Sequence, residues 1–268
     1  MRWSERQLAM LREMGIRLWP AAGDDANAPD DVHGDAPVAL AQTTDAAVID
    51  AAAPPVSHAP VVATPSHALS SHTSPVSTLD WPALRETVAA CTACRLCESR
   101  RQTVFGVGST RAHWMIVGEA PGEQEDRQGE PFVGKSGQLL DNMLRAIGLT
   151  RGEDAEPAQQ VYIANTLKCR PPGNRNPMPD ELAKCEDFLI RQVQLLQPKI
   201  ILAMGAFAVQ GLLRSTEPVG KLRGRVHRYQ GVPLVVTYHP AYLLRNLVDK
   251  AKAWDDLCLA VEASRSGA

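Results

Sequence analysis

Short apolar runs alternate with stretches of helical periodicity from about residue 81 onward. The runs Trp114–Val117, Val161–Ala164, Ile200–Ala203 and Leu234–Val236 are apolar throughout, as strands buried on both faces of a parallel sheet are. Apolar residues between them recur with the period of an α-helix. This alternation predicts a three-layer α/β domain around a parallel sheet of about four strands.

Two helices are well marked. Ser136 is expected to cap one that ends at Gly148, and Asp180, after Pro179, to start another that stops before Pro198. In an open α/β sheet, ligands bind at the carboxyl ends of the strands. We therefore expect the loops that follow the first, second and fourth strands to converge on one site.

The first 80 residues have a different composition. Residues 20–79 contain no lysine, arginine or aromatic residue and are rich in alanine, proline and aspartate. Such a segment cannot bury enough apolar area to offset its conformational entropy, so we expect a disordered linker. Residues 1–19 include a short amphipathic helix, which either packs on the distant domain or docks a replication or repair protein. The folded domain is expected at 80–268.

Charge is divided unevenly along the chain. Residues 1–80 carry 4 basic and 10 acidic side chains, and residues 81–268 carry 24 basic and 20 acidic ones. The expected domain is thus net positive, which is compatible with phosphate binding but does not prove it. There is no long apolar run and no signal-peptide pattern, so we expect a cytoplasmic monomer without membrane contact.

Cysteine spacing suggests a metal centre. Cys91-x2-Cys94 and Cys169-x15-Cys185 are two pairs that could supply four thiolates, and disulfides are rare in the cytoplasm. Spacing alone does not distinguish a zinc site from a [4Fe–4S] cluster. Cys97 adds a further x2 spacing and is either a spare thiol or a competing ligand.

The loop after the first strand contains several glycines. Glycines at 118, 122, 134 and 137 allow backbone amides to approach a ligand, and Ser136 with its neighbour opens a helix whose N-terminus suits a phosphate. The alternative is a sharp turn from strand to helix. The acidic residues beside this loop favour a catalytic role over a purely structural turn.

The loops after the second and fourth strands carry polar candidates. Asn165 ends a strand, where its amide either faces a base edge or caps the turn. Lys168, Arg170 and Arg175 lie among prolines and either grip a nucleic-acid backbone or are solvated. His239 before a proline is more often structural, but here it follows a strand and precedes an arginine.

Five separated motifs, in order, resemble family 4 uracil-DNA glycosylases. They are Gly118–Gly122, Pro131–Gly134, Asn165 four residues before Cys169, the run Cys169–Pro172, and His239–Arg245, and the resemblance covers roughly 85–260. It implies an α/β/α sandwich around a four-stranded parallel sheet. It also implies base excision repair, in which the protein flips uracil out of single- or double-stranded DNA and hydrolyses the N-glycosidic bond to leave an abasic site.

The resemblance further implies a cofactor. Four cysteines of this family hold a [4Fe–4S] cluster of structural role, and they match Cys91, Cys94, Cys169 and Cys185. Cys97 lies outside that set.

The resemblance assigns roles at the base. Phe132 would stack on the flipped uracil near Gly118, and Asn165 would read its O4 and N3–H edge. His239 would donate a hydrogen bond to O2, assisted by backbone amides around Glu119 and Ala120. Since Ala120 cannot activate water, Glu119 or Glu125 would orient water or support the cation, and Glu125 would also lie near C5.

Other matched residues would hold the DNA. Leu243 or Leu244 would wedge into the duplex, and phosphates would be bound by Lys135, Ser136, Arg170, Arg175 and Arg245. Two rival hypotheses remain. One is a glycosylase of broader base range, and the other is a non-catalytic uracil-DNA-binding or replication-associated iron–sulfur protein.

Overall fold

The computed structural model describes Glu13 and residues 76–152 and 154–266. Glu13 is helical. The rest of the helix expected within residues 1–19 lies outside the described residues. The linker expected at 20–79 also lies outside them, up to residue 75. The division of the chain at residues 19 and 79 therefore stays a prediction.

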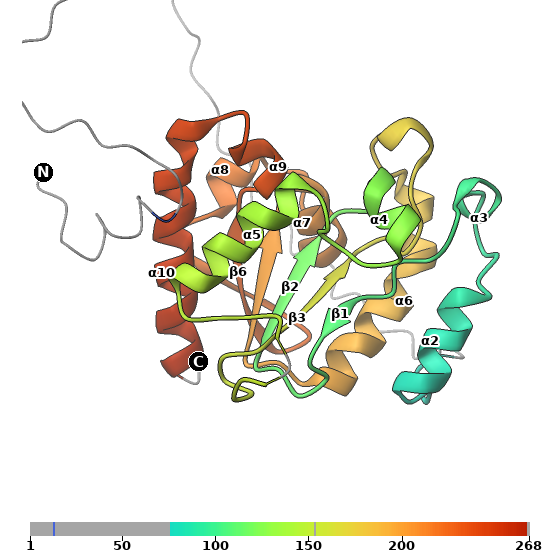
Figure 1. Cartoon of the computed structure of the whole chain (residues 1–268), viewed down its shortest axis with the longest axis horizontal. Helices are drawn as coiled ribbons and strands as arrows, with labels where there is room; N and C mark the ends of the chain where they lie inside the picture. The colour runs from blue at the N-terminus through green and yellow to red at the C-terminus, as the bar shows by residue number, and fades with distance from the viewer. Residues whose placement is uncertain (1–12, 14–75, 153, 267–268) are drawn as a thin grey trace, which may run out of the picture. The chain divides into compact units, whose positions relative to one another are not determined.

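A mixed six-stranded sheet forms the centre of the domain, in the order β1-β3-β2-β4-β6-β5 (Figure 1). The strands are β1 (Val107–Gly108), β2 (Trp114–Gly118), β3 (Val161–Asn165), β4 (Ile200–Met204), β5 (Val226–Tyr229) and β6 (Val232–Thr237). The four predicted strands are the parallel centre, β3-β2-β4-β6. The expected count of four was wrong because β1 and β5 add antiparallel edges. β1 is only two residues long, and β5 is partly exposed and contains His227 and Arg228, so neither forms an apolar run.

The helices are α2 (Trp81–Ala89), α3 (Leu96–Ser99), α4 (Glu123–Gln128), α5 (Lys135–Ala146), α6 (Pro179–Leu196), α7 (Ala206–Leu213), α8 (Val219–Leu222), α9 (Pro240–Leu243) and α10 (Lys250–Ser266), with 3-10 turns η1 (Pro172–Asn174) and η2 (Leu247–Asp249). Within the part of the chain that the structure describes, no helix is long and apolar enough to cross a membrane.

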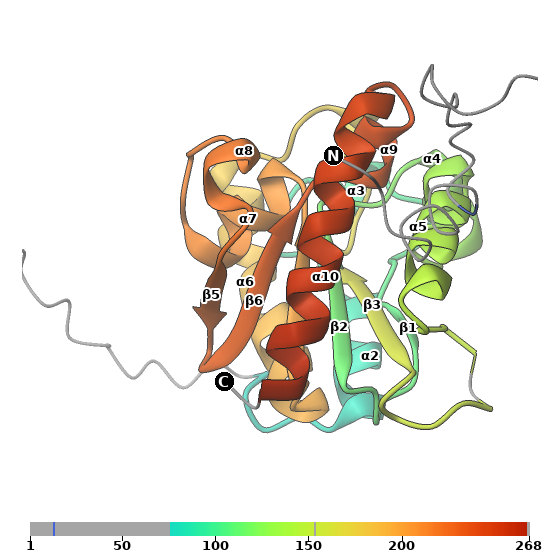
Figure 2. The same ribbon diagram turned by 90° about the vertical axis from the view of Figure 1, so that its left-hand side faces the viewer.

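Two apolar cores lie on opposite faces of the sheet. Alternate strand residues such as Ile116 and Leu202 pack with α5 and α10, and their neighbours Met115 and Ile201 pack with α6 and α7. Figure 2 shows α10 lying across one face of the sheet. Because successive side chains of a strand point to opposite faces, a strand covered on both sides is apolar at every position. The predicted three layers are confirmed.

The start of α5 lies against the main chain of Phe132. Gly134, not Ser136, is the N-cap, so the expected cap was wrong and Ser136 is the second helical residue. A Cβ on Gly137 would lie 1.8 Å from the carbonyl oxygen of Phe132, so only glycine allows this approach. Phe132 itself has a φ of 55°, which is uncommon outside glycine. Such conformations gather at functional sites.

Candidate active site

The carboxyl ends of the parallel strands open onto a cleft of about 710 Å³. Residues from 119–122 after β2, 171–175 after β3 and 238–245 after β6 line it, so the predicted convergence of these loops is confirmed. The loop after β4 was not predicted to take part, yet Gly205 and Phe207 also line the cleft. The same rule about strand ends would have identified them, since Gly205 follows β4 directly.

His239 lies in this cleft as the N-cap of α9. Its Nδ1 accepts a hydrogen bond of 3.1 Å from the main-chain N–H of Ala241, which leaves the ring hydrogen of the neutral form on Nε2. Burial, and after it the positive charge of Arg245, lowers the pKa of His239 to about 4. At pH 7 this histidine is therefore a neutral side chain with one N–H to donate.

Phe132 adjoins His239, and Asn165 and Gly118 lie beside Phe132. The rings of Phe132 and His239 stack with centroids 5.3 Å apart and an interplanar angle of 27°. A Cβ on Gly118 would lie 2.5 Å from Asn165 Oδ1 and 2.7 Å from Phe132 Cζ, so both side chains close over this glycine. The structure thus brings together four residues that the sequence placed on three loops.

The carboxamide of Asn165 is buried but available. Asn165 is 3% exposed, and no side-chain hydrogen bond of it is found among the described residues. Its amide atoms are not among the fully buried polar atoms without a partner in the described residues, so they stay accessible to a ligand. This favours recognition of a ligand over capping of the turn.

The two candidate carboxylates have different environments. Glu125 accepts hydrogen bonds from the main-chain N–H groups of Gly122 (3.1 Å) and Val133 (3.2 Å), so it caps α4 and ties down the loop that carries Phe132. Glu119 lines the cleft, and its carboxyl group has no hydrogen bond or ion pair within the described ranges. Burial raises the pKa of Glu119 to about 7. Of these two carboxylates, Glu119 is the one that lines the cleft.

The adjacent leucines differ in exposure. Leu243 is fully buried in the core that includes α5 and α10, whereas Leu244 is 42% exposed. Of these two leucines, only Leu244 is exposed enough to contact another molecule. Arg245, beside it, is exposed and lines the cleft.

The other predicted phosphate-binding residues differ in their exposure and in their contacts within the protein. Arg175 donates to both carboxylate oxygens of Glu181, at 2.9 and 2.6 Å, and Arg170 donates to Asn174 at 2.8 Å. Both are thus partly committed to contacts within the protein. Lys135 is exposed at the first turn of α5, and Ser136 follows it.

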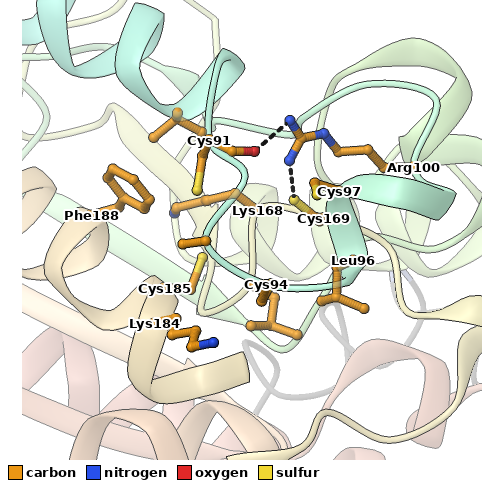
Figure 3. A pocket seen from close by; sticks show the side chains of 13 residues that line it. Cys91, Cys94, Leu96, Cys97, Arg100, Lys168, Cys169, Lys184, Cys185 and Phe188 are labelled. Atoms are coloured by element: carbon orange, nitrogen blue, oxygen red, sulfur yellow. Dashed lines mark hydrogen bonds between the residues drawn. The ribbon is translucent and has the colours of Figure 1, made fainter. Parts of the chain in front are cut away.

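Five cysteines line a separate pocket between α2, α3 and α6 (Figure 3). They are Cys91, Cys94, Cys97, Cys169 and Cys185. Arg100 donates to Cys169 Sγ at 3.0 Å and to the carbonyl oxygen of Cys91 at 2.8 Å, which joins two of the segments. In the part of the chain described, no group of three or more His, Cys, Asp or Glu side chains is arranged to hold a metal ion.

Desolvation dominates the electrostatics of these thiols. Burial raises the pKa of Cys94 and of Cys169, and it raises that of Cys185 to about 12. Neighbouring thiols add to each shift, because thiolates held close together repel one another. Thiolates in this pocket would need a positive centre among them, which is the chemistry of a thiolate-ligated metal.

Comparison with known proteins agrees with this site. The model of the uracil DNA glycosylase superfamily matches residues 105–258. A type-4 uracil-DNA glycosylase of Archaeoglobus fulgidus is 40% identical over 165 residues, which are 59% of this chain and 79% of that protein. Type-4 enzymes of Thermotoga maritima (42% identical over 60% of this chain and 81% of theirs) and Pyrobaculum aerophilum (38%, 68% and 93%) are similar.

The matched region contains the whole sheet and the cleft at its carboxyl edge. These three relatives are 38–42% identical to this chain, and the matches span 79–93% of their own lengths. The chain therefore belongs to the uracil DNA glycosylase superfamily and, within it, to the type-4 uracil-DNA glycosylases.

Proposed function

We propose that this protein is a DNA repair enzyme that removes uracil from DNA. Water adds to C1′ of the deoxyribose, the N-glycosidic bond breaks, and uracil leaves with the bonding electrons and then takes up a proton. The observation that carries this proposal is the hydrogen bond from Ala241 to His239 Nδ1, which leaves Nε2 to donate, in a ring that stacks on Phe132 at the cleft.

Base recognition uses the two side chains that close over Gly118. Phe132 stacks on the flipped uracil, and the free amide of Asn165 accepts from N3–H and donates to O4. Cytosine presents the opposite pattern and would leave the buried amide unpaired. Discrimination follows because an unpaired buried polar group is unfavourable.

Leaving-group stabilisation is the main source of catalysis. Negative charge develops on uracil O2 as the bond breaks, and His239 Nε2–H, with main-chain amides near Glu119 and Ala120, donates to it. The carboxylate of Glu119 orients water or supports the positive charge that develops on the sugar. Glu125, which the sequence offered as an alternative, holds the turn instead.

DNA is held by residues around the cleft. Leu244 fills the space that the flipped base leaves, which offsets the few kcal/mol of unstacking. Phosphates are bound by Arg245, Lys135 and the start of α5 at Ser136. Arg170 and Arg175 also contribute, in addition to their hydrogen bonds to Asn174 and Glu181. The net positive charge of the domain favours this contact.

We propose that the cysteine pocket holds an iron–sulfur cluster. Cys91, Cys94, Cys169 and Cys185 are four thiols from three segments that line one pocket, and the bond from Arg100 to Cys169 suits a sulfur that carries negative charge. When bound, a [4Fe–4S] cluster would supply a structural link between the segment after β3 and α6. Cys97 lines the same pocket and stands outside the proposed ligand set.

The test is base release from a defined oligonucleotide. Anaerobically purified protein is incubated with strands that carry uracil, thymine, cytosine or hypoxanthine at one position, and alkali then cleaves abasic sites. We expect cleavage only at uracil and its loss in His239→Ala. The matched control is His227→Ala, which removes a histidine of the edge strand β5 that is hydrogen-bonded to Leu222 and is not among the residues that line the cleft.

Two outcomes would contradict the proposal. Equal release of all bases would favour a glycosylase of broad range. Binding of uracil-DNA without any cleavage, by protein that retains its iron, would favour a non-catalytic role.

A further inference from the structure

A lysine is buried directly behind the residue proposed to read uracil. Lys168 is 1% exposed, and its Nζ donates to the main-chain oxygen of Asn165 at 2.8 Å and to Gln192 Oε1 at 2.6 Å. Its own carbonyl oxygen accepts from Val104 N at 2.8 Å. Both ends of Lys168 are thus fixed within the domain.

Gln192 completes a bridge from the strand to α6. It is fully buried, and its Nε2 donates to the carbonyl oxygen of Phe105 (2.9 Å) and to the hydroxyl of Tyr162 (3.1 Å). All of its amide atoms are therefore hydrogen-bonded. A buried polar network that is satisfied in this way is rigid and favours one arrangement.

Lys168 also lies beside the cysteine pocket. Figure 3 shows its side chain among the cysteines. Its ammonium is held there by the two hydrogen bonds to Asn165 and Gln192.

We propose that Lys168 is a positioning residue for uracil recognition. This inference rests on the proposed function of the cleft. Asn165 is the last residue of β3, and its side-chain direction depends on its main chain. Pairing with Gly118 fixes that main chain from β2, and Lys168, supported by Gln192, fixes it from the side of α6.

The test compares three variants with the wild-type protein. Lys168→Met keeps the length and apolar body of the side chain but removes the ammonium. Gln192→Met leaves Lys168 in place but removes the acceptor that supports its ammonium, together with the hydrogen bonds to Phe105 and Tyr162. Lys184→Met is the matched control, because Lys184 lines the same cysteine pocket but is exposed. For each protein we would measure inhibition by free uracil, affinity for product DNA with an abasic site, iron content and melting temperature.

We expect Lys168→Met to raise the inhibition constant of free uracil about tenfold, the effect of one misplaced hydrogen bond. Gln192→Met should have a smaller effect in the same direction, and Lys184→Met none. Affinity for abasic DNA and iron content should stay within about twofold. A purely structural defect would lower both affinities together, so the difference between them identifies positioning.

Other results would overturn the inference. Unchanged inhibition by uracil in folded Lys168→Met, or equal losses in uracil and abasic-DNA affinity, would contradict it. If Lys168→Met does not fold, Gln192→Met provides the test. An inhibition constant of free uracil equal to that of the wild-type protein would then refute the positioning role. Absence of uracil release by the wild-type protein would instead refute the proposed function itself.

Discussion

Excision should depend on pH through Glu119. Burial raises the pKa of this carboxyl group to about 7, and the proposed mechanism requires its carboxylate. About 9% of the molecules carry the carboxylate at pH 6 and about 91% at pH 8, so the single-turnover rate should rise about tenfold between them. His239 does not add to this change, because its pKa of about 4 leaves it neutral over the whole range.

The assay is single-turnover release of uracil from a fluorescent oligonucleotide at constant ionic strength. Glu119→Gln should be slower than the wild-type protein at pH 8 and should lose the rise between pH 6 and 8. Glu123→Gln is the matched control, since Glu123 lies on exposed α4 and pairs with Arg127. Persistence of the same inflection near pH 7 in Glu119→Gln would refute the reasoning.

Stability should change in the opposite sense. A carboxyl group whose pKa is raised by folding destabilises the folded state once it is ionised, so its effect appears as pH rises from about 4.5 through 7. Glu119→Gln should therefore melt at a higher temperature than the wild-type protein at pH 8, and at a similar temperature at pH 4.5. A lower melting temperature at pH 8 would show that the carboxylate is stabilised by a contact.

Three further predictions concern the cleft and the cysteine pocket. His239→Ala should lower the excision rate about 10²- to 10³-fold with little change in DNA affinity, because one preorganised donor is lost; single-turnover kinetics and binding titrations measure the two effects. Leu244→Ala should slow excision from duplex more than from single-stranded DNA, whereas removal of the buried neighbouring leucine by Leu243→Ala should lower the free energy of unfolding by about 2–5 kcal/mol in denaturant titrations. Cys185→Ser should lose iron in metal analysis, and Cys97→Ser should keep it; equal loss in the two variants would include Cys97 in the ligand set.

Several site assignments required the structure because neighbours in sequence have different environments. The leucine pair is one case, since Leu243 and Leu244 have the same chemistry and only packing against α5 and α10 separates core from surface. The two glutamates are another. Glu125 accepts hydrogen bonds from main-chain amides of the folded loop, whereas Glu119 lines the cleft.

The sequence by itself determined the four buried strands, the layered fold, the family and the loops that meet at the site. Each depends on local patterns, since a strand covered on both faces must be apolar along its length and parallel strands end at a common edge. The edge strands, the position of Phe207 in the lining of the cleft and the buried hydrogen bond from Lys168 to Asn165 became evident only in the folded structure. These depend on which side chains are buried and which polar groups find partners, and both are set by contacts between residues far apart in the chain.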